Sequence, residues 1–183
     1  MIEVGYFPKL IEAAEGFDVP GLREICSVSH CISSGPDDWI EHWKHNDFGW
    51  FNTIVDAMSV VPHARVADYR LFAYRMYPYL FRSGVERPVD LPSNVKPEAI
   101  PRTFETIGFD AASRYMPDVL GLECSPLSCN YMAQELPVTE QCLFRTLEEA
   151  IAGARQFSVG NVEPGDYFVL EVCEENTQRT QRL

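Results

Sequence analysis

The segment at 146–157 constrains the fold most, because it carries both a helix start signal and a helical repeat. Thr146 and Glu149 have the spacing of a capping box, in which each side chain bonds to the backbone N–H of the other residue. Apolar residues then recur every three or four positions, which is typical of a helix with one buried face. We expect this helix to end near Gly160 and a β-prone strand to follow at 167–173.

Further strands are predicted where β-branched and aromatic residues gather between turn signals. The segment at 66–82 is rich in tyrosine and phenylalanine, and we expect the strand to bend or end near Pro78, because proline is poorly tolerated inside a sheet. The other predicted strands are 1–7, 22–32 and 104–112, with a shorter candidate at 140–145.

Short helices are predicted at 34–46, 53–61 and 131–136, in addition to the one at 146–157. The chain lacks the regular alternation of strands and helices, and the glycine-rich motifs, that characterise nucleotide-binding folds. The sequence therefore predicts an α+β fold, with a mixed or mostly antiparallel sheet and helices packed on one face.

The chain of 183 residues is long enough for one core, and we expect a single domain over 1–183. The segment 84–102 contains four prolines and few large apolar residues, so it is either a linker or a loop wrapped over the surface. If it is a linker, it separates sub-halves at 1–83 and 103–175. The polar tail at 176–183 is expected to fray.

The formal net charge is -12, from 15 Lys and Arg against 27 Asp and Glu. A negative surface repels phosphate backbones and anionic membranes, so we expect neither nucleic acid nor a membrane as partner. The chain has no signal-like N-terminus and no apolar run long enough to span a bilayer. A soluble, cytoplasmic protein is therefore expected, and its six cysteines should be reduced there.

The most unusual segment is 121–130, in which Cys124 and Cys129 bracket a short Ser/Pro loop. Cys124 could act as a nucleophile if a base such as His42 lowered its pKa. The two cysteines could instead form a reversible disulfide, or they could simply fill the interior.

A helix at 34–46 would place four polar side chains opposite its tryptophans. These residues could supply acid or base groups to a thiol-dependent enzyme, hydrolytic or redox, that uses Cys124. The two histidines could instead complete a zinc site with two upstream cysteines, or the whole face could be solvated. The polar residues are Asp38, Glu41, His42 and His45, and the zinc alternative uses Cys26, Cys31, His42 and His45.

Aromatic residues near the middle of the chain could line a cleft or could belong to the core. The cleft interpretation, with Trp43, Trp50, Phe51 and Tyr74 beside Cys129, predicts an acidic binding or regulatory protein for a protein or small-molecule partner. No cofactor is expected on this interpretation. The thiol-dependent enzyme and the structural zinc-binding domain are the alternatives.

Overall fold

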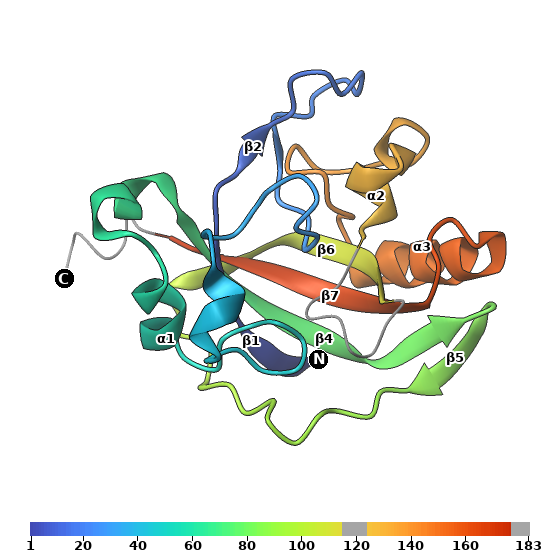
Figure 1. The fold of residues 1–183 in the computed structure, drawn as a ribbon. Helices are drawn as coiled ribbons and strands as arrows, with labels where there is room; N and C mark the ends of the chain where they lie inside the picture. The colour runs from blue at the N-terminus through green and yellow to red at the C-terminus, as the bar shows by residue number, and fades with distance from the viewer. Residues whose placement is uncertain (115–123, 177–183) are drawn as a thin grey trace.

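The computed structural model describes residues 1–114 and 124–176, which form an α+β fold around a five-stranded antiparallel sheet (Figure 1). The α+β class and the mostly antiparallel sheet predicted from the sequence are thus confirmed. The strand order is β1-β4-β7-β6, and β5 also pairs with β4. The strands are β1 (Ile2–Lys9), β4 (Arg70–Arg82), β5 (Val85–Pro88), β6 (Phe104–Arg114) and β7 (Asp166–Glu175).

Helices and short elements surround this sheet. The helices are α1 (Ile54–Ser59), α2 (Pro126–Cys129) and α3 (Leu147–Gly160). The 3-10 helices are η1 (Trp39–His42), η2 (His63–Asp68) and η3 (Met132–Gln134). A separate two-stranded ribbon joins β2 (Glu12–Ala13) to β3 (Glu24–Ile25).

Strand β4 organises the sheet because it pairs along both edges. On one edge its first half pairs with β1 and its last residues pair with β5, and on the other edge it pairs with β7. The pairing with β7 is irregular between Met76 and Leu80, on either side of Pro78. Proline has no N–H to donate, so the strand continues through this residue with a local break in the ladder. The β4–β7 pair also joins segments 1–83 and 103–175 in one sheet.

Side chains of β7 alternate between two apolar clusters on opposite faces of the sheet. Tyr167 and Val169 face the cluster that α3 covers, whereas Phe168 and Leu170 face the other cluster. Alternation with a period of two is what a strand buried on both faces requires. The second face is covered largely by non-helical segments, including the aromatic residues Phe48, Trp50 and Phe51.

The Pro-rich segment 84–102 packs against the rest of the protein through its apolar residues. It begins with β5 and then returns along the lower part of the view toward α1 (Figure 1). Its later apolar residues pack against the cluster that contains Phe168. Four of its side chains make this contact, which explains why the segment carries apolar residues between its prolines: Val89, Leu91, Val95 and Ile100.

Helix α3 begins as predicted, because both hydrogen bonds of the capping box between Thr146 and Glu149 are present. It ends after Gly160, where Asn161 adopts the left-handed conformation that closes many helices. The helix also passes close to Phe144, because Gly153 has no side chain. A Cβ at Gly153 would lie 2.5 Å from Cζ of Phe144.

The predicted helix at 34–46 is wrong, because only the single turn η1 forms there. Asp38 and Trp43 have φ angles of 58° and 52°, and these left-handed residues stop helical propagation at both ends of the turn. The helix predicted at 53–61 is confirmed as α1, which Thr53 caps. The helix predicted at 131–136 is reduced to η3.

Two predicted strands are also shorter than expected. Only Glu24–Ile25 of segment 22–32 forms a strand, and the chain beyond it folds as an irregular loop. Segment 140–145 makes only an isolated bridge, between Phe144 and Phe109 of β6. The two segments also bond to each other, because the N–H groups of Arg23 and Glu24 donate to the carbonyl oxygen of Glu140 and the N–H of Cys26 donates to that of Gln141.

Within residues 1–114 and 124–176, no helix has the length and apolar character needed to cross a membrane. Residues 121–123 of the segment 121–130 lie outside the described residues, as does most of the tail at 176–183.

Candidate metal centre

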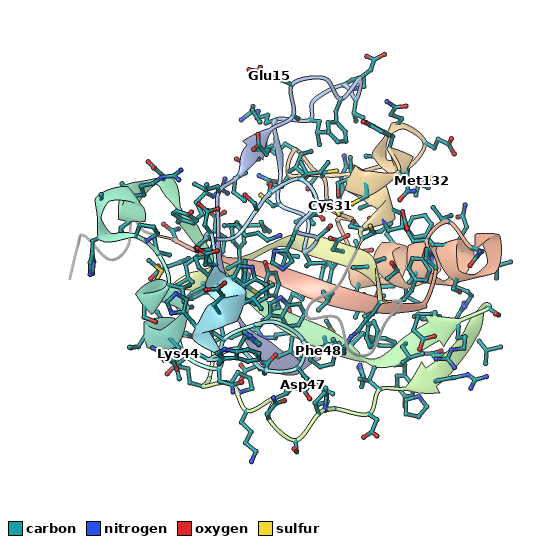
Figure 2. The ribbon with its side chains drawn as sticks, viewed as in Figure 1. Glu15, Cys31, Lys44, Asp47, Phe48 and Met132 are labelled. Carbon is teal, nitrogen blue, oxygen red and sulfur yellow. The ribbon has the colours of Figure 1, made fainter. Side chains whose placement is uncertain are left out.

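Three cysteines from two distant segments converge beside α2. The Sγ atoms of Cys31, Cys124 and Cys129 all lie within 4.8 Å of one another. The Sγ atoms of Cys31 and Cys124 are 3.8 Å apart. Cys31 is exposed, and the other two side chains are partly buried. Figure 2 shows Cys31 on a loop that faces α2.

The loop that carries Cys31 folds around a buried lysine at the end of β1. The ammonium group of Lys9 donates hydrogen bonds to the carbonyl oxygens of Ser27, at 2.5 Å, and Ser29, at 2.6 Å. The hydroxyl of Ser29 then accepts a hydrogen bond from the backbone N–H of Cys31, at 3.1 Å. Lys9 is only 1% exposed, so these carbonyl oxygens replace water as its hydrogen-bond partners. This pairing explains why segment 26–33 leaves the extended conformation.

The other two cysteines are placed by β6 and by the single turn of α2. The carbonyl oxygen of Cys124 accepts a hydrogen bond of 2.8 Å from the N–H of Ser113 on β6. Ser125 precedes α2, and Pro126 occupies the first turn, where its missing N–H costs nothing. The N–H of Cys129 donates to the carbonyl oxygen of Ser125, at 2.8 Å, so the turn brings Cys129 back beside Cys124.

A buried carboxylate on β6 connects the two cysteine-bearing segments. One carboxylate oxygen of Asp110 accepts a hydrogen bond of 2.9 Å from the N–H of Val28. The other accepts from the N–H of Ala111, at 2.8 Å, and from the hydroxyl of Ser125, at 2.6 Å. Asp110 is fully buried, and these three donors compensate the loss of water around its carboxylate.

Burial opposes ionisation of the cluster in the absence of a cation. It raises the pKa of the Cys124 thiol, and the neighbouring sulfurs of Cys129 and Cys31 raise this pKa further. Burial likewise raises the pKa of Cys129, although a hydrogen bond from Ser29 opposes the shift. In the metal-free cluster the raised pKa values of Cys124 and Cys129 therefore favour their thiol forms, whereas a bound divalent cation would favour the thiolates.

The spacing of the sulfurs suits a tetrahedral metal. A Zn–S bond is about 2.3 Å long, which makes the edge between two sulfurs of a zinc tetrahedron about 3.8 Å. The separation of 3.8 Å between the Cys31 and Cys124 sulfurs equals this edge. Cys129 would supply a third ligand, and among the described residues the convergent group consists of these three.

The histidines proposed from the sequence lie elsewhere. Both ring nitrogens of His45 lie near backbone carbonyl oxygens, those of Asn46 at 3.3 Å and Ile40 at 3.2 Å. His42 is exposed on η1, where Asp38 and Glu41 are exposed too. In the described part of the chain, no hydrogen bond joins Cys124 to either histidine. The proposed pairing of this thiol with an imidazole base is therefore not assembled.

The predicted zinc set is divided between different surroundings. Cys26 is fully buried, and its thiol lies 3.7 Å from the carboxylate of Glu24. Cys31 belongs instead to the three-cysteine cluster. Within the described residues, His42 and His45 do not belong to that convergent group. Of the four predicted zinc ligands, Cys31 therefore belongs to the cluster. Its companions there are Cys124 and Cys129, which the sequence analysis had assigned to a different candidate site.

The aromatic residues proposed for a ligand cleft separate into core and surface. Trp50, Phe51 and Tyr74 are at most 1% exposed and belong to the core, whereas Trp43 is 80% exposed. The Trp50 and Tyr74 rings pack with their centroids 4.9 Å apart. These three residues therefore stabilise the fold and leave Trp43 as the exposed member of the predicted set.

Two supporting residues were missed in the sequence. Asp110 interrupts an apolar run in β6, and Lys9 is the last residue of β1, directly after Phe7 and Pro8. A charged residue inside an apolar strand signals a buried polar interaction. No sequence pattern indicated that both would bond to the segments that carry the cysteines.

Comparison with known proteins adds no relative: no family model, no curated protein and no solved structure matches the chain.

Proposed function

We propose that this protein binds a zinc ion through the thiolates of Cys31, Cys124 and Cys129. The observation that carries the proposal is the convergence of the three sulfurs within 4.8 Å. Thiolates favour soft or borderline cations, and zinc is the usual partner of tetrahedral thiolate sites. Of the functions considered from the sequence, metal binding has the best geometric support, with a ligand set that differs from the predicted one.

The surroundings of Cys124 favour a bound cation over a catalytic nucleophile at this residue. A thiol enzyme needs a base, a nearby positive charge or a helix N-terminus that lowers the pKa of its nucleophile. The pKa of Cys124 is raised instead, and its sulfur contacts Cys31. A zinc ion would displace the thiol protons and compensate the cost of burying the thiolates.

The proposed zinc links parts of the chain that are distant in sequence. Cys31 belongs to the loop that folds around Lys9, whereas Cys124 precedes α2 and Cys129 is its last residue. A metal bound to all three sulfurs therefore connects this loop to α2 in the folded state. Because the unfolded chain does not hold these ligands together, zinc binding stabilises the fold. We propose a cytoplasmic location, where the thiols stay reduced.

Metal analysis of the full chain tests the proposal. Protein purified without chelator is expected to contain about one zinc per chain, and replacement with cobalt should produce thiolate-to-cobalt charge-transfer absorption. Replacement of any one of Cys31, Cys124 or Cys129 by serine should lower zinc content and remove that absorption. Wild-type protein that stays metal-free after dialysis against zinc contradicts the proposal.

Two control variants separate this ligand set from the predicted one. Cys26→Ser and His42→Ala remove members of the set predicted from the sequence, and neither residue lies in the cluster. Both variants should keep the zinc and the cobalt spectrum of the wild type. Loss of metal in His42→Ala, with metal retained in Cys124→Ser, would favour the other set and reject this one.

A further inference from the structure

We infer that Cys31 and Cys124 form a reversible disulfide when a hydroperoxide oxidises the metal-free protein. This reaction is a second activity of the cluster, and Cys31 is its site of modification. The disulfide itself requires no metal. Only its control by zinc, described below, rests on the proposed function.

The two sulfurs are already in contact. They are 3.8 Å apart, so an approach of about 1.8 Å gives the disulfide length of about 2.05 Å. The main chain of Cys124 is held by the hydrogen bond from Ser113, whereas Cys31 lies in an irregular loop. We therefore expect Cys31 to make most of the movement.

Exposure gives the two cysteines different roles. Cys31 is exposed, so a hydroperoxide can reach its sulfur, whereas Cys124 is partly buried. A solvent-accessible cysteine beside a resolving cysteine is the arrangement found in redox-sensing sites. Cys31 is thus the sulfur that is oxidised first, and Cys124 is the sulfur that resolves the oxidised form.

Hydrogen peroxide supplies the oxidising equivalents in two balanced steps. The sulfur of Cys31 attacks one peroxide oxygen and the O–O bond breaks, which forms a sulfenic acid at Cys31 and releases water. The sulfur of Cys124 then attacks the sulfenic sulfur, and the S–O bond breaks. The thiol proton of Cys124 leaves with the hydroxide as a second water. Two thiols are oxidised to one disulfide, while one peroxide is reduced to two waters.

The geometry favours this pair over the disulfide that the sequence suggested between Cys124 and Cys129. Cys129 ends α2, its N–H bonds to the carbonyl oxygen of Ser125, and its sulfur lies 3.4 Å from the hydroxyl of Ser29. A bond from Cys124 to Cys129 would draw together the two ends of this turn. The bond from Cys31 to Cys124 leaves α2 intact and keeps Cys129 as a thiol.

Zinc binding and disulfide formation exclude each other, because both use the sulfurs of Cys31 and Cys124. A bound zinc would keep these sulfurs at the tetrahedral edge of about 3.8 Å and would occupy a lone pair on each. Oxidation would remove two of the three proposed ligands. The cluster would then release its metal under oxidising conditions and recover it after reduction.

The test uses the full chain after removal of metal by a chelator. Hydrogen peroxide is added, remaining thiols are alkylated, and the denatured protein is run on a non-reducing gel. A disulfide between positions 93 apart closes a long loop, which makes the unfolded chain migrate faster. The wild type and Cys129→Ser should show this fast species, which dithiothreitol should remove.

Cys31→Ser and Cys124→Ser should both lose the fast species. Tandem mass spectrometry of the oxidised wild type identifies the linked sulfurs directly, so the test remains decisive if a variant folds poorly. A fast species that persists in Cys124→Ser, or a wild type that forms no reducible intramolecular disulfide, overturns the inference. A linkage found between Cys124 and Cys129 also overturns it.

A parallel experiment adds one equivalent of zinc before the peroxide. We expect the disulfide to form about tenfold more slowly, because the metal holds both thiolates. An unchanged rate together with a disulfide between Cys31 and Cys124 rejects the zinc site and supports the redox pair. Bound zinc without any disulfide in the metal-free protein rejects the redox pair alone.

Discussion

Asp110 and Ser125 are joined by a hydrogen bond of 2.6 Å in the interior of the protein. Ser125 directly follows Cys124, and the same carboxylate also accepts a hydrogen bond from Val28, three positions before Cys31. One buried side chain thus positions both segments that carry the cysteine cluster. Because supporting residues of this kind orient metal ligands, Asp110 should matter to zinc binding without touching the ion.

Asp110→Asn is therefore expected to lower zinc affinity by about 10- to 100-fold. Asparagine has one oxygen and one amide group, so if its oxygen faces Ser125 its NH2 faces the N–H of Val28. That hydrogen bond is lost, and the loop leading to Cys31 is less firmly held. Competition with a chromogenic chelator measures the affinity. Asp68→Asn, which alters an exposed ion pair with Arg65, is the control, and equal affinities in both variants contradict the prediction.

The stability of the protein should depend on pH through Lys9. Burial lowers the pKa of Lys9 to about 7 from its ordinary value of 10.5, and nearby acidic groups oppose this shift. Between these two values the unfolded chain holds a proton that the folded chain lacks, so the free energy of unfolding rises with pH across this window. Below it, Lys9 is charged in both states and the cost of burying its charge is fully present. The facing groups are Asp110, Cys26, Cys31, Cys129 and His30.

Lys9→Met removes this titration while keeping a long side chain. From pH 7.5 to 8.5, the free energy of unfolding of the wild type should gain about 1 kcal/mol relative to the variant. Urea unfolding at several pH values, with metal-free protein, measures the difference. Lys44→Met, on the exposed surface, serves as the control. Parallel pH profiles for the wild type and Lys9→Met would show that burial does not perturb Lys9.

Gly153→Ala should destabilise the protein, although alanine is the better helix former. The helix-propensity gain is about 1 kcal/mol, whereas overpacking costs about 1–3 kcal/mol. The new Cβ would lie 2.5 Å from the ring of Phe144, which is itself buried. In Gly160→Ala the nearest contact would be an ordinary 3.6 Å, so that variant should be neutral or more stable. Thermal unfolding compares the two, and equal or higher stability in Gly153→Ala would contradict the packing argument.

The exposed and buried tryptophans should differ sharply in their effect on stability. Trp50→Ala removes a large ring from the core and is expected to cost about 3–5 kcal/mol. Trp43→Ala should change stability by no more than about 0.5 kcal/mol, because its side chain is 80% exposed. Denaturant unfolding followed by circular dichroism measures both. A large decrease in the free energy of unfolding of Trp43→Ala would indicate that this residue supports the fold.

Short sequence motifs correctly predicted the helices whose first turns are stabilised by hydrogen bonds between residues close in sequence. The capping box at Thr146 and Glu149 correctly predicted the start of α3. Thr53 similarly predicted the start of α1. The pattern at 34–46 failed because Asp38 and Trp43 adopt left-handed conformations that only contacts elsewhere in the fold can impose.

The candidate site could be predicted only in part. The sequence drew attention to Cys124 and Cys129, and it proposed Cys31 as a metal ligand, but it placed them in different sites. Their convergence depends on Lys9 and Asp110, whose partners in the cysteine-bearing segments lie 15 to 82 positions away in the chain. Spacing along a sequence carries no information about contacts at such separations.

The sequence by itself determined the α+β class, the helix that follows the capping box, four of the five strands of the sheet (β1, β4, β6 and β7) and the strongly negative charge, because these depend on composition and short-range periodicity. The tertiary structure alone decided which cysteines meet. Cys31 and Cys124 are separated by 93 positions and lie 3.8 Å apart, because β1 and β6 hold their segments through buried polar side chains. Such a contact exists only once the sheet has formed.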